Sequence, residues 1–286
     1  IVQKRNFALD IILKKSIEQV CSMMNKEKTL FIFEGARTEN KFVEKLEVNF
    51  LEKIHAIKCV YDAEIYQLYR AIKKEDKFFF DVVDMLKERS IENAEILKDY
   101  NRNSFAYIYL FFDYDAHSTL ADDNKISEML SYFNDETDNG MLYISYPMVE
   151  AIRHFKNMES FKDLTVKCKR RNCPYIDSCT KQIDCQKEPH YKQLAAIDSK
   201  PQLSNLNSYT AFIWKELITA HLSKANYLVN NVFSLPSYLI DQRTIFAKQL
   251  EKHINKVCPE VAVLSAFPLY VLDYYGIEKL LMKLNP

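Results

Sequence analysis

The chain has 286 residues, with 39 Lys and Arg against 39 Asp and Glu, so its formal net charge is zero. That length can bury a sizeable core and fits one large domain or two modest ones. Charge neutrality excludes a uniformly basic nucleic-acid binder, so any such surface must be a local patch. With three glycines and no Walker or dinucleotide fingerprint, the chain also lacks Gly-rich phosphate-binding loops.

The first half of the chain predicts alternating strands and helices. Apolar residues at three- and four-residue spacing indicate a helix over 7–25, and continuous apolar runs indicate buried strands over 29–34 and 105–113. This alternation predicts an α/β fold with a mostly parallel sheet and helices on both faces. The other predicted elements are a helix opening at Thr38, a short strand over 56–61, helical segments over 64–98, a helix capped by Asp122 or Asp123, and a strand over 141–145.

After Glu150 the composition changes. Residues 160–200 hold four of the seven cysteines, and the rest of the chain predicts helices over 207–232, 237–256 and 266–284, separated by prolines. The apolar stripes of these helices fit either a core or a homodimer or partner surface. We therefore expect an N-terminal helix (1–27), an α/β domain (28–157), a small Cys-rich module (158–200) and a helical C-terminal region (201–286).

The cellular setting follows from segments that the sequence lacks. No apolar run approaches the ~20 residues that a membrane-spanning helix needs, and no secretory signal precedes the first predicted helix. We expect a cytoplasmic protein with no membrane contact. Its cysteines should then be reduced thiols or metal ligands.

Acidic residues follow two of the predicted buried strands. Glu34 comes directly after the first, and Asp113 and Asp115 end the second. Chemistry in open α/β sheets sits beyond the carboxyl ends of the strands, so these carboxylates should meet at one edge. Clustered carboxylates stay ionised only with a cation among them, and hard oxygen ligands suit Mg²⁺ or Mn²⁺. The alternative is two buried strands that end in solvated acidic turns.

The order Glu34-Gly35-x-x-Thr38-Glu39, then Asp113-x-Asp115, resembles the TOPRIM domain over roughly residues 28–155. It is most similar to the OLD nucleases and the small TOPRIM proteins of phage-defence systems. The resemblance implies a Mg²⁺- or Mn²⁺-dependent endonuclease that hydrolyses phosphodiester bonds. Asp113 and Asp115 would be metal ligands, and Glu34 the first metal ligand or the general base.

Four further residues have two interpretations each. By the resemblance, Glu39 joins the metal site and Glu150 belongs to a Pro-x-x-Glu element that also contributes; either could instead be an acid that complements a helix dipole. Arg37 could meet a phosphate or be a surface arginine. His117, two residues past Asp115, could carry a proton or be incidental.

The cysteine cluster predicts a structural metal. Its spacing is Cys-x4-Cys-x5-Cys-x5-Cys, and four thiolates suit tetrahedral Zn²⁺, with an iron–sulfur cluster as the second choice. Basic residues beside the first cysteine could bind the phosphate backbone of a nucleic acid. The cysteines are Cys168, Cys173, Cys179 and Cys185, and the basic residues are Lys169, Arg170 and Arg171.

The whole chain resembles nuclease subunits that work beside an ATPase in abortive-infection systems of the PARIS and AbiL kinds. This implies an antiviral effector that cleaves nucleic acid, RNA such as transfer RNA rather than DNA, when a separate ABC- or OLD-type ATPase releases or activates it. A possible homodimer is part of the same expectation. The alternative hypothesis is a non-catalytic module with a TOPRIM-like fold that binds nucleic acid or a partner.

Overall fold

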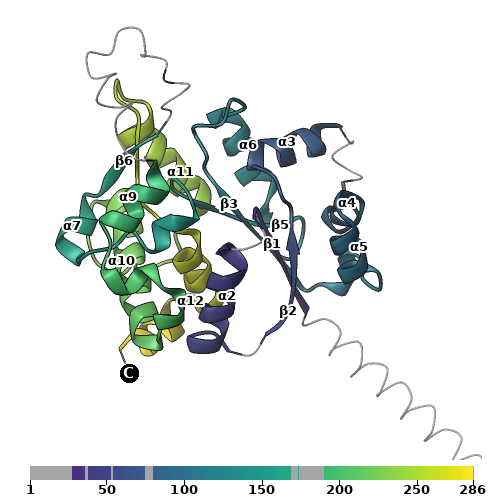
Figure 1. The fold of residues 1–286 in the computed structure, drawn as a ribbon, viewed down its shortest axis with the longest axis horizontal. Helices are drawn as coiled ribbons and strands as arrows, with labels where there is room; N and C mark the ends of the chain where they lie inside the picture. The colour runs from purple at the N-terminus through teal and green to yellow at the C-terminus, as the bar shows by residue number, and fades with distance from the viewer. Residues whose placement is uncertain are drawn as a thin grey trace, which may run out of the picture.

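A computed structural model of the chain describes its central sheet (Figure 1). The sheet has five strands in the order β2-β1-β3-β5-β4. Four of them run parallel, and the two-residue β4 pairs antiparallel with β5. The strands are β1 (Lys28–Phe33), β2 (His55–Val60), β3 (Tyr107–Asp113), β4 (Asn134–Asp135) and β5 (Gly140–Ser145). The described residues are 28–35, 38–52, 54–74, 80–168, 173 and 190–285, so the helix predicted over 7–25 lies outside them.

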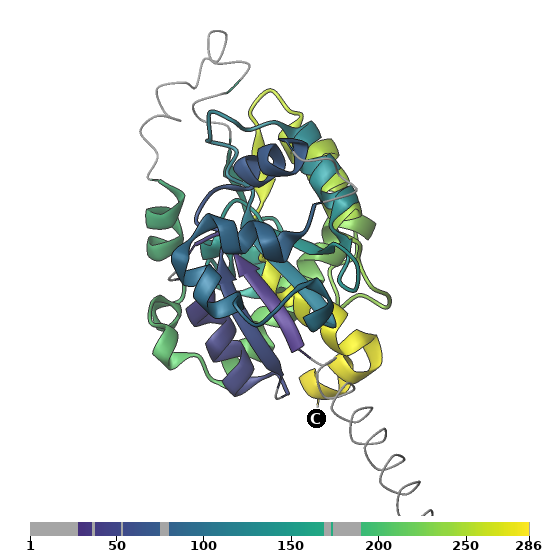
Figure 2. The same cartoon turned by 90° about the vertical axis from the view of Figure 1, so that its right-hand side faces the viewer.

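Both faces of the sheet are covered by helices, which confirms the predicted mixed α/β fold with a mostly parallel sheet. Figure 1 shows α2 (Thr38–Asn49) and α12 (Ala266–Leu284) on one side, and α10 (Ala211–Asn230) packs against both. Seen after a 90° turn, the helices of the other side lie in front of the strands and yellow α12 lies behind them (Figure 2). That layer contains α3 (Ile65–Lys74), α4 (Val82–Arg89), α5 (Ile91–Leu97) and α6 (Asp123–Tyr132).

Local capping divides the long helical pattern that follows β2. Asp81 accepts hydrogen bonds from the backbone N–H groups of Val83 and Asp84 at the start of α4, and Ser90 accepts one from Asn93 at the start of α5. Each cap satisfies N–H groups that have no partner inside the helix, so one helix ends where the next begins. Asp122 caps α6 as predicted.

The C-terminal helix belongs to the core of the sheet. The ring of Phe111 in β3 lies 5.2 Å from Phe267 and 5.6 Å from Tyr270, both on α12. Phe31 of β1 also lies 5.6 Å from Tyr270. The apolar stripe of α12 is therefore buried against the strands rather than left for a partner.

The C-terminal region is helical as expected but contains a strand that the sequence pattern did not indicate. β6 (Thr165–Lys167) and β7 (Glu260–Ala262) form a separate antiparallel pair. Runs of three residues are too short to show a period-two pattern. None of the helices among the described residues is long and apolar enough to cross a membrane. The remaining elements are 3₁₀ turns at Arg102–Ser104, Val149–Ile152, Pro201–Ser204 and Leu206–Ser208, helices α7 (Met158–Lys162), α9 (Tyr191–Ile197) and α11 (Gln242–Gln249), and the π-helix η5 (Leu250–Ile254).

Candidate functional site

The carboxyl ends of the parallel strands meet at one edge, which we call the carboxyl edge. The backbone N–H of Glu34 donates to the carbonyl of Phe111 at 3.0 Å, and Asp113 lies in register with Ser145. The N–H of Asp62, just after β2, donates to the carbonyl of Glu34 at 2.9 Å. The segments after β1, β2, β3 and β5 therefore lie side by side.

Glu34 and Asp113 form the centre of this edge. The Glu34 Oε2 atom accepts a hydrogen bond from the backbone N–H of Asp113 at 2.9 Å. Burial, together with the nearby charge of Asp115, raises the pKa of Glu34 to about 9. The side chain of Asp113 is buried, and burial and the Glu34 charge raise its pKa well above its usual value. Two desolvated carboxylates this close repel each other, so a proton or a bound cation would stabilise the pair.

Asp115 lies in the left-handed region of backbone space, with φ of 43°. A non-glycine residue there is strained, which is frequent at functional loops. Its buried Oδ1 atom has no hydrogen-bond partner among the described residues, although His117 Nδ1 approaches it to 3.6 Å. Burial raises the pKa of Asp115, whereas the His117 imidazole lowers it.

Glu39 is turned back from the first turn of α2 towards the loop after β1. Its Oε1 accepts a hydrogen bond from the backbone N–H of Gly35 at 3.3 Å, and its side chain is buried. A Cβ atom on residue 35 would lie 3.3 Å from Glu39 Oε2, a tight contact that the Glu39 carboxylate would have to relieve by a small shift. Burial raises the pKa of Glu39, and the Glu150 charge adds to the effect.

Glu150 completes the predicted acidic set, but from a 3₁₀ turn rather than from the start of a regular helix. It is 3% exposed, and Lys192 Nζ lies 3.3 Å from its Oε1. Its other oxygen, Oε2, is buried and has no hydrogen-bond partner among the described residues. The Glu150 charge contributes to the raised pKa values of Asp113 and Asp115, so it lies near both.

Glu64 is a further acid at this edge that the sequence interpretation missed. It lies between β2 and α3, and its charge raises the pKa of both Glu34 and Asp115. The rule that selects Glu34, an acid just beyond a parallel strand, would also have selected Glu64. We call the full set the carboxylate cluster: Glu34, Glu39, Glu64, Asp113, Asp115 and Glu150.

The carboxylates do not converge on a common point. In the part of the chain that the structure describes, no group of three or more His, Cys, Asp or Glu side chains is arranged so that it could hold a metal ion. Three of them are turned to separate local donors: Glu34 to the Asp113 N–H, Glu39 to the Gly35 N–H and Glu150 to Lys192. The donor type and the orphaned oxygens of Asp115 and Glu150 suit a hard cation.

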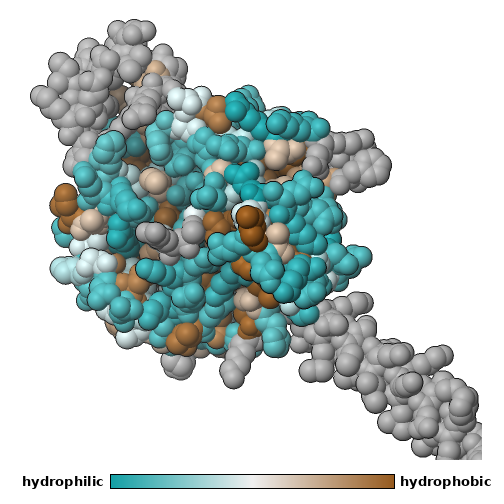
Figure 3. Space-filling model, turned by 45° about the vertical axis from the view of Figure 1, so that its right-hand side comes forward, coloured by the Kyte–Doolittle hydropathy of each residue, from teal (hydrophilic) through white to brown (hydrophobic). Residues whose placement is uncertain are grey.

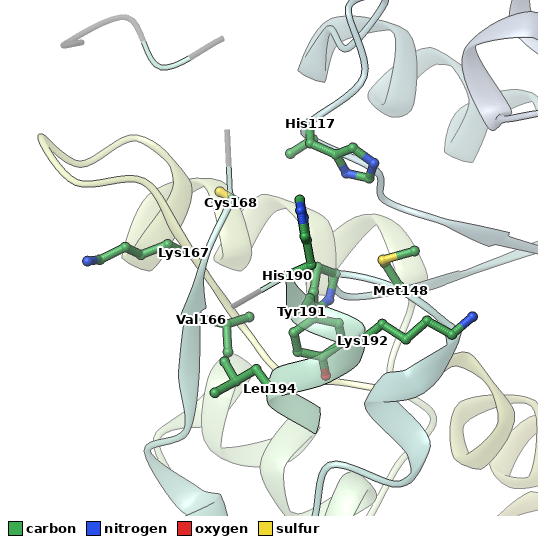
Figure 4. Close-up of a pocket in the computed structure, with 11 residues that line it drawn as sticks. His117, Met148, Val166, Lys167, Cys168, His190, Tyr191, Lys192 and Leu194 are labelled. Carbon is green, nitrogen blue, oxygen red and sulfur yellow. The ribbon is translucent and has the colours of Figure 1, made fainter. Parts of the chain in front are cut away.

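Two cavities adjoin the cluster, and Lys192 lines both. The first, of about 420 Å³, lies between the His117 loop, β6 and α9. Figure 4 shows His190 reaching from the start of α9 towards His117. The second, of about 630 Å³, lies between α2 and the segment after α9, and Glu150 is in its wall. The basic residues that line them are Lys41, Lys45, His117, Arg153, Lys167, His190 and Lys192.

The predicted cysteine cluster is described only in part. Cys168 follows β6, is buried, and its N–H donates to the carbonyl of Pro259 at 3.1 Å. Cys173 is partly exposed. The other predicted ligands and basic residues lie outside the described residues: Arg37, Lys169, Arg170, Arg171, Cys179 and Cys185. The zinc or iron–sulfur site therefore stays a prediction.

Comparison with known proteins adds no family. No family model matches the chain, and comparisons with curated proteins and with solved structures give no match either.

Proposed function

We propose that this chain is a metal-dependent nuclease that hydrolyses phosphodiester bonds. The observation that carries the proposal is the carboxylate cluster at the carboxyl edge of the parallel sheet. Acids with raised pKa values, gathered at the edge where α/β enzymes place their chemistry, mark a functional site more often than a structural one.

The cluster has the donors that Mg²⁺ or Mn²⁺ would need. Glu34, Asp113 and Asp115 would hold the ion, with Glu39 and Glu150 beside them, once their side chains turn from their present orientations to a shared point. A bound ion would supply charge neutralisation at the phosphoryl group and a more acidic attacking water. Glu34 would be the first ligand of the ion or the general base: the Asp113 N–H fixes its carboxylate, and a bound cation would keep it ionised in spite of its raised pKa.

The two cavities support a nucleic-acid substrate. Lys41 and Lys45 on α2, with Arg153 and Lys192, put positive charge on the wall of the larger cavity beside Glu150. A neutral chain that binds a polyanion needs such a local patch. The resemblance favours RNA, such as transfer RNA, over DNA.

The biological setting rests on the resemblance alone. It suggests an effector of an antiviral defence system, in which a separate ABC- or OLD-type ATPase controls the nuclease. On the face shown in Figure 3, hydrophobic residues form separate spots among hydrophilic ones, so a partner that docks there would meet a mainly polar surface.

The test is cleavage by purified protein. Wild type, Glu34→Gln and the control Glu92→Gln are incubated with total transfer RNA, plasmid and single-stranded DNA, with Mn²⁺ or EDTA. Glu92 is an exposed acid on α5 that lines neither cavity beside the cluster. We expect wild type and Glu92→Gln to cleave one substrate class with Mn²⁺, and Glu34→Gln to be inactive. Equal cleavage by Glu34→Gln would contradict the proposal, and the same assay with the partner ATPase tests a latent enzyme.

A second candidate function is a non-catalytic module that binds nucleic acid or a partner. The divergent orientation of the carboxylates and the ion pair between Lys192 and Glu150 favour it. It predicts that Lys41→Gln with Lys45→Gln abolishes nucleic-acid binding and cellular function, whereas Glu34→Gln changes neither. The two candidates therefore differ in which charge, acidic or basic, the activity requires.

A further inference from the structure

A third cavity, of about 220 Å³, lies among the helices and strands that follow the α/β core. It is formed by the end of α7, the start of β6, the second half of α10, η5 and β7. None of its lining residues belongs to the carboxylate cluster or to the two cavities beside it. We call it the lysine cavity because Lys162, Lys224 and Lys252 line it.

Lys224 is the most unusual residue of this cavity. It is 2% exposed, although it is near the middle of α10. Its Nζ donates to the carbonyl of Leu164 at 2.5 Å and lies 4.4 Å from the centre of the Phe161 ring. Among the described residues, no carboxylate forms an ion pair with it. Lysine is almost never fully buried unless it is paired, and the acidic charge that favours this ammonium is that of exposed Asp163, which forms no ion pair with it.

The other two lysines add to the positive charge. Lys252 Nζ donates to the carbonyl of Leu228 and to Asn231 Oδ1, both at 2.7 Å. Lys162 Nζ lies 4.6 Å from the centre of the Tyr227 ring. These contacts hold the ammonium groups in place. Each ammonium has three N–H donors, so some donors remain for a ligand.

Little acidic charge opposes these lysines. Asp163 is the one carboxylate among the described residues that line the cavity, and it is exposed to solvent. His253 also lines the wall; burial and the Lys224 charge lower its pKa, so it is a neutral donor or acceptor at neutral pH. Burial likewise lowers the pKa of Lys224. The cavity is thus a partly desolvated site that an anion would stabilise.

We propose that the lysine cavity binds a phosphate group, held by Lys224, Lys252 and Lys162. Its volume is below the roughly 300–1,000 Å³ of pockets for drug-sized ligands, which limits the ligand to inorganic phosphate or a small phosphate monoester. Lysine binds phosphate as a point charge, and such charge-assisted hydrogen bonds are about twice as strong as neutral ones. Tyr227 and Asn231 add a flat face and an amide at the wall.

The test is isothermal titration of the full chain, in EDTA, with inorganic phosphate and with glycerol 3-phosphate as a small phosphate monoester. Wild type should bind at least one of them with a dissociation constant in the millimolar range or below. Lys224→Met and Lys252→Gln should each weaken binding about tenfold or more, since each removes a charged donor. Tighter binding of glycerol 3-phosphate identifies an ester as the ligand, and equal or tighter binding of phosphate identifies the free anion.

The controls separate this site from the proposed nuclease. Lys41→Gln, at the cavity beside the carboxylate cluster, and Glu34→Gln should both bind phosphate as wild type does. Lys252 is partly exposed, so Lys252→Gln keeps the test valid even if Lys224→Met unfolds the protein. Unchanged affinity in the lysine variants, or no binding of either probe by wild type, would overturn the proposal. Neither result depends on whether the chain cleaves nucleic acid.

Discussion

The metal-free protein should lose stability as the pH rises, and Glu34→Gln should reduce that loss. The folded-state pKa of Glu34 is about 9, against 4.5 for an ordinary glutamate. Between these values the folded state holds a proton that the unfolded state releases, so the free energy of unfolding falls by about 1.4 kcal/mol per pH unit. From about pH 5.5 to about pH 8.5 the loss is about 4 kcal/mol, a large part of a typical stability.

Glutamine tests this reasoning because it is neutral at every pH and can still accept the hydrogen bond from the Asp113 N–H. Urea unfolding in EDTA, followed at a series of pH values, gives the slope for each variant. With rising pH, the free energy of unfolding should fall less steeply in Glu34→Gln than in wild type, by the slope that corresponds to about one proton. The slope for exposed Glu44→Gln should match that of wild type. If wild type and Glu34→Gln share one slope, the pKa argument for the cluster is wrong.

Three further predictions concern the cluster, the core and the lysine cavity. Mn²⁺ at about pH 8 should raise the melting temperature of wild type but not of Asp113→Asn; an equal rise in both would place the ion elsewhere. Tyr270→Ala should lower the free energy of unfolding by about 3–5 kcal/mol in urea titration, because it uncovers the aromatic face of the sheet; under 1 kcal/mol would contradict that packing. Lys224→Met should raise stability by about 1–3 kcal/mol in phosphate-free buffer at neutral pH, and a loss would mean that the ammonium has a stabilising partner.

The sequence was sufficient to predict the sheet because its strands are buried on both faces. Runs such as 29–33 and 107–112 have no alternation, which is typical of parallel strands. Once those strands are placed side by side, the positions of Glu34 and Asp113 follow from where each run ends. Their neighbourhood could therefore be predicted without any side-chain geometry.

Contacts between distant segments could not be predicted in the same way. The aromatic stripe of α12 fitted a core or a partner surface equally well, and its contact with Phe111 depends on the path of a chain about 150 residues long. The ion pair of Lys192 with Glu150 and the register of β6 with β7 are likewise set by tertiary packing. Glu64 is different, because its position just after β2 could have been predicted from the sequence pattern.

The carboxylate cluster and the lysine cavity are connected by one physical argument. Each gathers like charges in a partly desolvated place, and each therefore costs folding free energy that an apolar replacement would avoid. A chain of zero net charge has opposite charges available, yet among the described residues Lys224 forms no ion pair and has only the charge of exposed Asp163 to favour its ammonium, and the cluster's ion pairs with basic residues there are few. Such uncompensated charge is expected where a ligand of the opposite sign binds, a cation at the carboxyl edge and an anion in the lysine cavity. If stability at neutral pH rises in both Glu34→Gln and Lys224→Met while the corresponding ligand no longer binds, the same residues oppose folding and serve binding.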